Sequence, residues 1–190
     1  MTGMRRSEIC ALRWQDVDLE RREIHVVHSL TKGGGFSLDT PKDPSGKDAT
    51  RTICFGKSLL GFLEDRKRSM KSDLDGLGDW DDGLYVIGNA VTGDFENPEM
   101  LGREWSMLAR AEKWTGTQGE IVRFHDLRHT FATLAIANKM DVMTIAGILG
   151  HRDATTTLNI YATALEESKR STMNTLDTIL YPSTDKIDDE

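Results

Sequence analysis

The chain alternates apolar and polar residues only in its first third, and elsewhere its apolar residues recur at helical spacing. Residues 23–28 (Glu-Ile-His-Val-Val-His) have the alternation typical of a half-buried strand. Two more short strand candidates, 36–39 and 51–55, follow the turn-rich stretches 32–35 and 41–46. These three segments predict a small antiparallel sheet of three strands.

Helical periodicity accounts for most of the remaining chain. A first helix is expected over 4–13, and a second over 57–72 has its apolar positions on one side, at Leu59, Leu60, Phe62 and Leu63. Further helices are expected over 97–113, 125–138, 141–149, 154–162 and 165–180, with a short extended piece at 84–87. The predicted fold class is therefore mainly α with a small antiparallel three-stranded β-sheet (α+β).

Local signals mark two of these helix ends. Asn97-Pro98 is typical of a helix start, because proline is favoured at the first helical position. Gly150 fits a C-terminal cap, where a positive φ is needed. One domain is expected over 1–181, followed by a flexible acidic tail at 182–190.

Composition adds little, and the charge is unevenly distributed. The 190 residues are 29% charged and 38% hydrophobic, which is typical of a globular protein, and no apolar run reaches membrane length. Segments 73–82 and 164–190 together carry a net charge of −9, against −7 for the whole chain, so the remainder is slightly basic. Two cysteines, Cys10 and Cys54, favour a reducing compartment and have no zinc-site spacing.

The most informative chemistry lies between residues 125 and 161. His125 and Arg128 are followed by His151 after a Leu-Gly pair, and then by Tyr161. Arginine binds phosphate oxygens, histidine transfers protons near neutral pH, and a tyrosine oxygen can carry a phosphoryl group covalently. Together these residue types are suited to attack on a phosphodiester.

Each residue also has an ordinary explanation. On the helix from residue 125, Leu127, Phe131 and Leu134 share one stripe, which is the expected core face, while His125 and Arg128 lie on another. That second stripe is equally typical of a solvated polar face. A zinc pair of histidines four residues apart lacks the glutamate and third ligand that such a site needs. An isolated tyrosine is more often a half-buried aromatic residue.

Read together, these positions resemble the motifs of the tyrosine recombinase (phage integrase) family over residues 2–163. Residues 2–8 (Thr-Gly-Met-Arg-Arg-Ser-Glu) resemble its first arginine box, with Arg5 as the catalytic arginine and Glu8 as its accompanying acid. Thr40-Pro41-Lys42, ahead of Arg51-Thr52-Ile53, resembles its β-hairpin lysine segment. The remaining family positions match His125, Arg128, His151 and Tyr161. Arg6 competes with Arg5, and Lys32 and Lys47 compete with Lys42.

The resemblance implies a DNA breaking-rejoining catalytic fold and a role for each matched residue. Tyr161 attacks a DNA strand to form a 3′-phosphotyrosyl bond, while Arg5 and Arg128 bind the scissile phosphate. Lys42 protonates the departing 5′-oxygen. His125 and His151 are catalytic as well, His125 at the tyrosine proton and His151 at the phosphate, while Glu8 supports the site as a buttress. No metal, nucleotide or other cofactor is needed.

The resemblance also implies partners and surroundings. These are double-stranded DNA at specific recombination sites, and a homo-oligomer, expected to be a tetramer, assembled through the 165–180 helix in trans. The resemblance further implies that the protein is located in the bacterial cytoplasm, at the nucleoid. It also implies that the chain is N-terminally truncated and that DNA-binding domains lie upstream of it. Two other functions stay open: a type IB topoisomerase, which a plasmid relaxation assay would reveal, and a DNA-binding module without catalysis.

Overall fold

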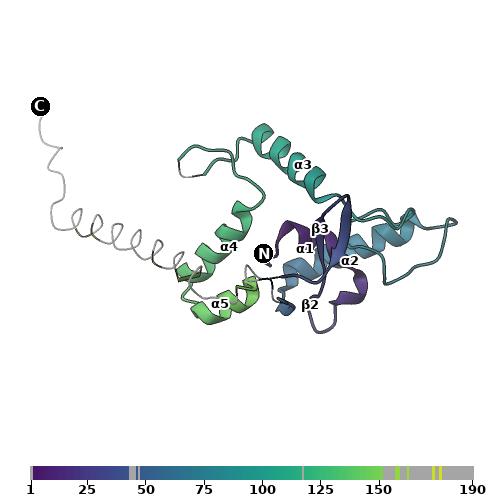
Figure 1. Cartoon of the computed structure of the whole chain (residues 1–190), viewed down its shortest axis with the longest axis horizontal. Helices are drawn as coiled ribbons and strands as arrows, with labels where there is room; N and C mark the ends of the chain where they lie inside the picture. The colour runs from purple at the N-terminus through teal and green to yellow at the C-terminus, as the bar shows by residue number, and fades with distance from the viewer. Residues whose placement is uncertain are drawn as a thin grey trace, which may run out of the picture.

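The structure is a computed structural model that describes residues 2–42, 46, 48–116, 118–151, 157, 158, 162, 173 and 176. Helices predominate among these residues, with two small antiparallel sheets, which confirms the predicted fold class (Figure 1). The helices are α1 (Arg6–Ala11), the 3₁₀ turn η1 (Trp14–Asp16), α2 (Lys57–Asp73), α3 (Pro98–Ala111), α4 (Asp126–Ala137) and α5 (Val142–Leu149). The strands are β1 (Val17–Asp18), β2 (Glu23–Val26), β3 (Ser29–Lys32), β4 (Phe36–Asp39) and β5 (Arg51–Cys54).

The strand pairing differs from the predicted single sheet. β1, β2 and β5 form one antiparallel sheet, in which Ile24 lies opposite Ile53. β4 pairs instead with β3, a strand that the periodicity did not predict. The reason is local, because the Gly33-Gly34-Gly35 turn folds its own flanking residues onto each other, and short-range pairing of this kind wins over a distant partner.

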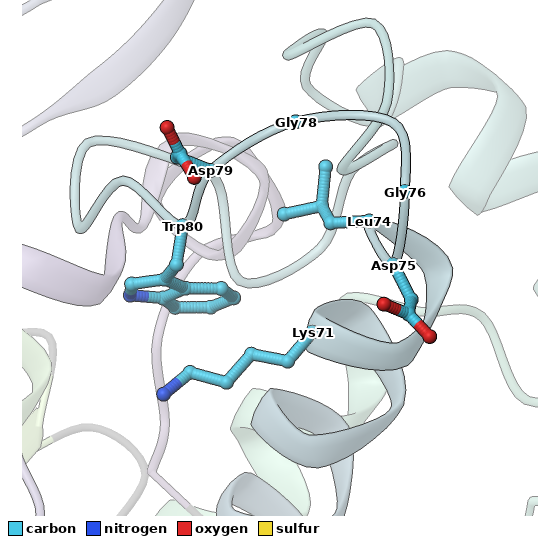
Figure 2. Close-up of a pocket in the computed structure, with 7 residues that line it drawn as sticks. All are labelled: Lys71, Leu74, Asp75, Gly76, Gly78, Asp79 and Trp80. Atoms are coloured by element: carbon cyan, nitrogen blue, oxygen red, sulfur yellow. The ribbon is translucent and has the colours of Figure 1, made fainter.

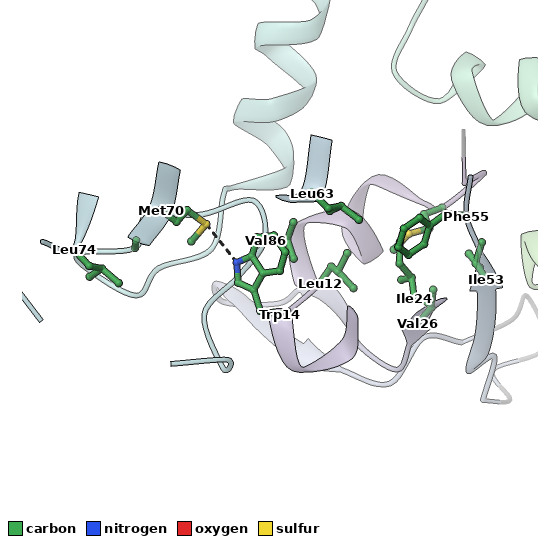
Figure 3. Close-up of a cluster of buried hydrophobic side chains, with 12 residues drawn as sticks. Leu12, Trp14, Ile24, Val26, Ile53, Phe55, Leu63, Met70, Leu74 and Val86 are labelled. Atoms are coloured by element: carbon green, nitrogen blue, oxygen red, sulfur yellow. Dashed lines mark hydrogen bonds between the residues drawn. The ribbon is translucent and has the colours of Figure 1, made fainter. Parts of the chain in front are cut away.

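The main hydrophobic core lies between the three-stranded sheet and α2 (Figure 3). Trp14, Ile24, Ile53 and Met70 are each no more than 2% exposed, and the Trp14 indole N–H donates to the Met70 sulfur at 3.4 Å. The predicted apolar side of α2 was partly wrong, because Phe62 is 70% exposed while Met70, two turns along, is buried.

The predicted helix ends at 97, 141 and 150 are confirmed. The Asn97 side chain accepts from the Glu99 amide with Pro98 at the first helical position, and the Asp141 side chain accepts from the Thr144 amide. Gly150 is left-handed, with a φ of 67°. The expected extended piece at 84–87 is no strand but an isolated β-bridge between Tyr85 and Arg13, beside which the Val86 N–H donates to the Leu12 carbonyl. Of the expected 154–162 and 165–180 helices, only residues 157, 158, 162, 173 and 176 are described, and all are helical.

The first helix is shorter than predicted, and this places its start at the site. Arg5 and Leu12 have extended backbones on either side of α1, and Gly3 has a φ of +65°. A Cβ added to Gly3 would lie 2.7 Å from the Leu149 side chain and 2.9 Å from Phe131. The start of the chain therefore lies directly against α4 and α5, as Figure 1 also shows.

The inward face of α4 was predicted correctly only at Phe131, which packs against the core that α4 and α5 share. Leu127 is 40% and Leu134 58% exposed, whereas Arg128, Ala132 and Ile136 are buried. The small Ala132 side chain allows α5 and the start of the chain to approach this face, and Arg128 is buried because it finds polar partners there. Among the described residues, no helix is both long and apolar enough to cross a bilayer.

Candidate active site

Arg128 joins three parts of the chain that are far apart in sequence. Its Nη1 donates to the Gly3 carbonyl at 2.6 Å, and its Nη2 donates to the Leu149 carbonyl at 2.5 Å and lies 2.8 Å from His151 Nε2. The residue is 6% exposed. Burial, with a further contribution from Arg5, lowers its pKa to about 10, so the guanidinium stays charged at neutral pH.

Arg5 lies at the N-terminus of α1 and is held by Glu8. Its backbone N–H donates to Glu8 Oε2 at 2.7 Å, and its Nη1 donates to Glu8 Oε1 at 2.8 Å. Arg51 binds both oxygens of the same carboxylate, at 3.0 and 2.8 Å. Burial would raise the pKa of Glu8, but hydrogen bonds and charge from Arg51 and Arg5 outweigh it and lower the pKa. Glu8 is therefore an ionised carboxylate between two guanidiniums.

His151 is uncharged in this arrangement, and its tautomer follows from its partners. Burial and the neighbouring Arg128, Arg5 and Arg51 lower its pKa to about 4. Since a guanidinium can only donate, Nε2 accepts from Arg128. Nδ1 then carries the proton and donates to Thr157 Oγ1 at 3.0 Å. His151 thus stabilises the orientation of Arg128 without adding positive charge.

One open cavity of about 540 Å³ connects the predicted phosphate-binding groups. Arg5, Arg128 and the exposed His125 all line it. Burial, and then the charges of His129 and Arg128, lower the pKa of His125. The cavity lining also contributes the cations Arg6, Lys32 and Arg123 and a single carboxylate, Glu99. The described lining therefore favours an anionic ligand.

The structure separates Arg5 from Arg6. Arg5 contacts the buried Glu8, whereas the Arg6 guanidinium packs over Gly102 of α3, where an added Cβ would collide with Arg6 Nη1. Only Arg5 is thus part of the network that contains Arg51 and reaches the end of α5. This geometry favours Arg5 over Arg6 as the first arginine.

The three lysine candidates occupy different positions. Lys42 is exposed, and its backbone forms an isolated antiparallel β-bridge with Asp48. It does not line the cavity that Arg5 and Arg128 share. Lys32 lines that cavity, where its ammonium pairs with Glu99. Lys47 lies outside the described residues. The segment 48–50 that follows Lys42 shares a second cavity, of about 270 Å³, with His151.

Tyr161 lies outside the described residues. Thr157, four positions before it, is helical, fully buried and bonded to His151. Among the described residues, no group of three His, Cys, Asp or Glu side chains is placed to hold a metal ion.

Sequence reasoning missed Arg51. Its side chain is 7% exposed, and besides Glu8 it binds the Ile148 carbonyl at 2.6 Å. One signal was available, because Arg51 shares the inward side of its strand with Ile53 and Phe55. A charged residue in such a position needs a buried partner.

A separate hollow of about 530 Å³ lies in the acidic loop after α2 (Figure 2). Trp80, Lys71 and Asp79 line it, and the Lys71 ammonium lies 5.1 Å from the centre of the Trp80 ring. None of the predicted site residues that the structure describes lines this hollow.

The chain is similar to known proteins over most of its length. The model of the phage integrase family matches residues 1–168. The XerC-like tyrosine recombinase of Caldanaerobacter subterraneus is 27% identical, with 92% of this chain and 46% of that protein covered. The ICEBs1 integrase of Bacillus subtilis is 29% identical, with 95% and 47% covered. This chain therefore spans about half the length of these relatives.

Solved structures show the same similarity. The Tn1549 transposon integrase, in complex with transposon right end DNA, is 27% identical with a TM-score of 0.69, and 92% of this chain and 55% of that chain are covered. XerA recombinase is 25% identical with a TM-score of 0.62, with 90% and 54% covered.

Proposed function

The chain belongs to the phage integrase family, and on this premise we propose that it is the catalytic part of a site-specific DNA recombinase. Such an enzyme cleaves a DNA strand and rejoins it to a new partner, and thereby integrates or excises a mobile element. The single observation that carries the proposal is the convergence of Arg5, Arg128 and His125 on one cavity. Two guanidiniums at one cavity are suited to a phosphodiester, because each can donate to its non-bridging oxygens.

The proposed chemistry is a transesterification. The Tyr161 hydroxyl loses its proton and its oxygen bonds to phosphorus, while the bond from phosphorus to the 5′-oxygen breaks. The 5′-oxygen takes a proton from Lys42, which leaves a 3′-phosphotyrosyl bond and a free 5′-hydroxyl. The reverse reaction, with a different 5′-hydroxyl, joins the new strands.

The described side chains support this scheme. Arg5 and Arg128 stabilise the charge that gathers on the phosphate oxygens in the transition state. His125 accepts the tyrosine proton, since its lowered pKa keeps it neutral at pH 7. His151 accepts from Arg128 through its Nε2 and so orients that guanidinium toward the phosphate.

The test is a nicked suicide DNA substrate that carries the recombination site, found from repeats that flank the gene. The wild-type chain should form a covalent complex that survives a denaturing gel, and Tyr161→Phe should bind the DNA without forming it. Tyr85→Phe is the matched control, because the Tyr85 hydroxyl accepts from Arg13 and Tyr85 does not line the cavity. A covalent complex in Tyr161→Phe would refute the assignment of the nucleophile.

We also propose that the chain acts as a tetramer on double-stranded DNA at the bacterial nucleoid, and that its 165–180 segment docks on a neighbouring protomer. Met173 and Leu176 support this, because both are helical, three positions apart, and 64% and 44% exposed. Met173→Glu should lower the protein-to-DNA ratio of the complex, as measured by mass photometry, and an unchanged ratio would count against docking in trans.

A further inference from the structure

The two arginines that line the cavity are connected through a third. We propose that Arg51 is a positioning residue that holds both Arg5 and Arg128 in their phosphate-binding orientation, a role that rests on the proposed function. Along the sequence, Arg51 lies on β5, after α1, at the start of which Arg5 lies, and before α4, which carries Arg128. It does not line the cavity that they share, so it acts through them.

The first connection runs through Glu8. Arg51 faces both carboxylate oxygens, with Nη1 3.0 Å from Oε1 and Nη2 2.8 Å from Oε2. Arg5 gives Glu8 one guanidinium nitrogen and its backbone N–H. Because the Arg51 fork fixes the plane of the carboxylate, Glu8 holds Arg5 at one point and leaves the rest of its guanidinium for another anion.

The second connection runs through the last turn of α5. Arg51 Nε donates to the Ile148 carbonyl at 2.6 Å, and Arg128 Nη2 donates to the next carbonyl, that of Leu149, at 2.5 Å. A Cβ added to Gly150 would lie 2.9 Å from Arg51 Nη1, so Arg51 also packs against the cap of this helix. The same turn leads directly to His151. Arg51 thus fixes the segment that orients Arg128.

The charges of the network explain why its geometry needs such a residue. Arg5, Arg51 and Arg128 surround one buried carboxylate, Glu8, and the charges of Arg5 and Arg51 contribute to the lowered pKa of Arg128. The three cations repel one another in a buried setting, where charges are poorly screened. Their positions therefore depend on each hydrogen bond that holds them.

Removing Arg51 should consequently displace Arg5 rather than simply loosen the fold. In Arg51→Met, Glu8 keeps Arg5 as its one cationic partner, and the carboxylate can then take two guanidinium nitrogens from Arg5. The α5 turn also loses its contact at the Ile148 carbonyl. A displacement of about 1 Å at a reacting group lowers a rate by on the order of 10²-fold, and we expect a loss of that size in covalent-complex formation.

The test compares two DNA substrates that differ only at the scissile phosphate. One is the natural diester, and the other carries a methylphosphonate, in which an uncharged methyl group replaces one non-bridging oxygen. An arginine clamp matters less on the neutral substrate, because it has less charge to stabilise. We expect Arg51→Met to be slow on the diester and close to wild type on the methylphosphonate, and Arg51→Lys to be intermediate on the diester because an ammonium has no planar fork.

The matched control is Arg66→Met. Arg66 is a half-buried arginine whose guanidinium, like that of Arg51, is held by hydrogen bonds, here to the carbonyls of Val86 and Gly88, and it does not line the cavity. Arg66→Met should be less stable in thermal unfolding, and it should form the covalent complex more slowly by the same factor on both substrates. An equal loss on both substrates in Arg51→Met would overturn the positioning role while the wild type remains active. A wild-type chain that forms no covalent complex on either substrate would instead refute the proposed function, and the positioning role with it.

Discussion

Replacing Glu8 by glutamine should destabilise the protein strongly, although the change is nearly isosteric. Glu8 is 1% exposed and is the carboxylate that Arg5 and Arg51 share. Glutamine keeps an accepting oxygen but removes the charge, and its amide group faces guanidinium donors that it cannot accept from. Removing one partner of a buried ion pair costs about 3–5 kcal/mol, because the remaining charge is left buried without compensation.

The measurement is urea unfolding at pH 7. With a denaturant slope of about 2 kcal/mol per molar, the lower limit of 3 kcal/mol moves the midpoint of Glu8→Gln down by about 1.5 M. Glu99→Gln is the control, because Glu99 pairs with Lys32 at the surface and its loss should leave the midpoint unchanged. Equal midpoints for wild type and Glu8→Gln would refute the account of Glu8 as the centre of the network.

The same carboxylate predicts a pH dependence. The folded pKa of Glu8 is lowered, so its contribution is complete above the pKa of an unfolded glutamate, about 4.3, and is lost as pH falls through the lower folded value. Acidification should therefore reduce the difference in free energy of unfolding between wild type and Glu8→Gln. If this difference in free energy stays constant from pH 7 down to pH 3, the charge of Glu8 does not contribute to stability.

Three further predictions concern the surroundings of the site. Gly150→Ala should lower the free energy of unfolding by about 1–2 kcal/mol because its backbone is left-handed, and by more because Arg51 lies close to the added Cβ. Gly93 also has a positive φ but has open space around it, so Gly93→Ala should show only the backbone loss. Thermal unfolding of both variants measures the difference. Stability should fall as pH drops from about 6.5 toward 4, because the unfolded chain takes up a proton that the folded His151, with its pKa of about 4, does not. His151→Gln should flatten this slope in urea titrations, and an unchanged slope would exclude His151 as its source. On α4, Leu134→Ala should change stability by less than about 0.5 kcal/mol and Ile136→Ala should lose about 2–5 kcal/mol, and the opposite order would contradict the inward face described above.

The grouping of residues in the candidate site was predictable where a local motif names them. Arg5, His125 and Arg128 were expected together from their motifs, and the structure brings all three to one cavity. The role of Arg51 was not predictable in this way. Its partners, Glu8 and Ile148, lie 43 and 97 positions away along the chain, and no local periodicity reports such a distance.

The lysine shows the same limit in another form. The residues around Lys42 resemble a motif and so predict Lys42, whereas the structure places Lys32 on the cavity lining, paired with Glu99. A motif names residue types in order, while access to a phosphate depends on how two strands and a loop are arranged in space. The assignment of Lys42 therefore stays a prediction, to be tested by Lys42→Ala and Lys32→Ala on the suicide substrate.

The sequence by itself determined the elements that depend on neighbouring residues. The cap at Asn97, the left-handed Gly150 and the mainly helical fold all follow from backbone preferences that act over a few positions. Only the tertiary structure decided that α4 buries Arg128 while exposing Leu134. Periodicity shows which residues share a face, but the choice of the buried face depends on what packs there. Here that is a backbone carbonyl from each of two distant segments, whose hydrogen bonds make it favourable to bury a cation instead of a leucine.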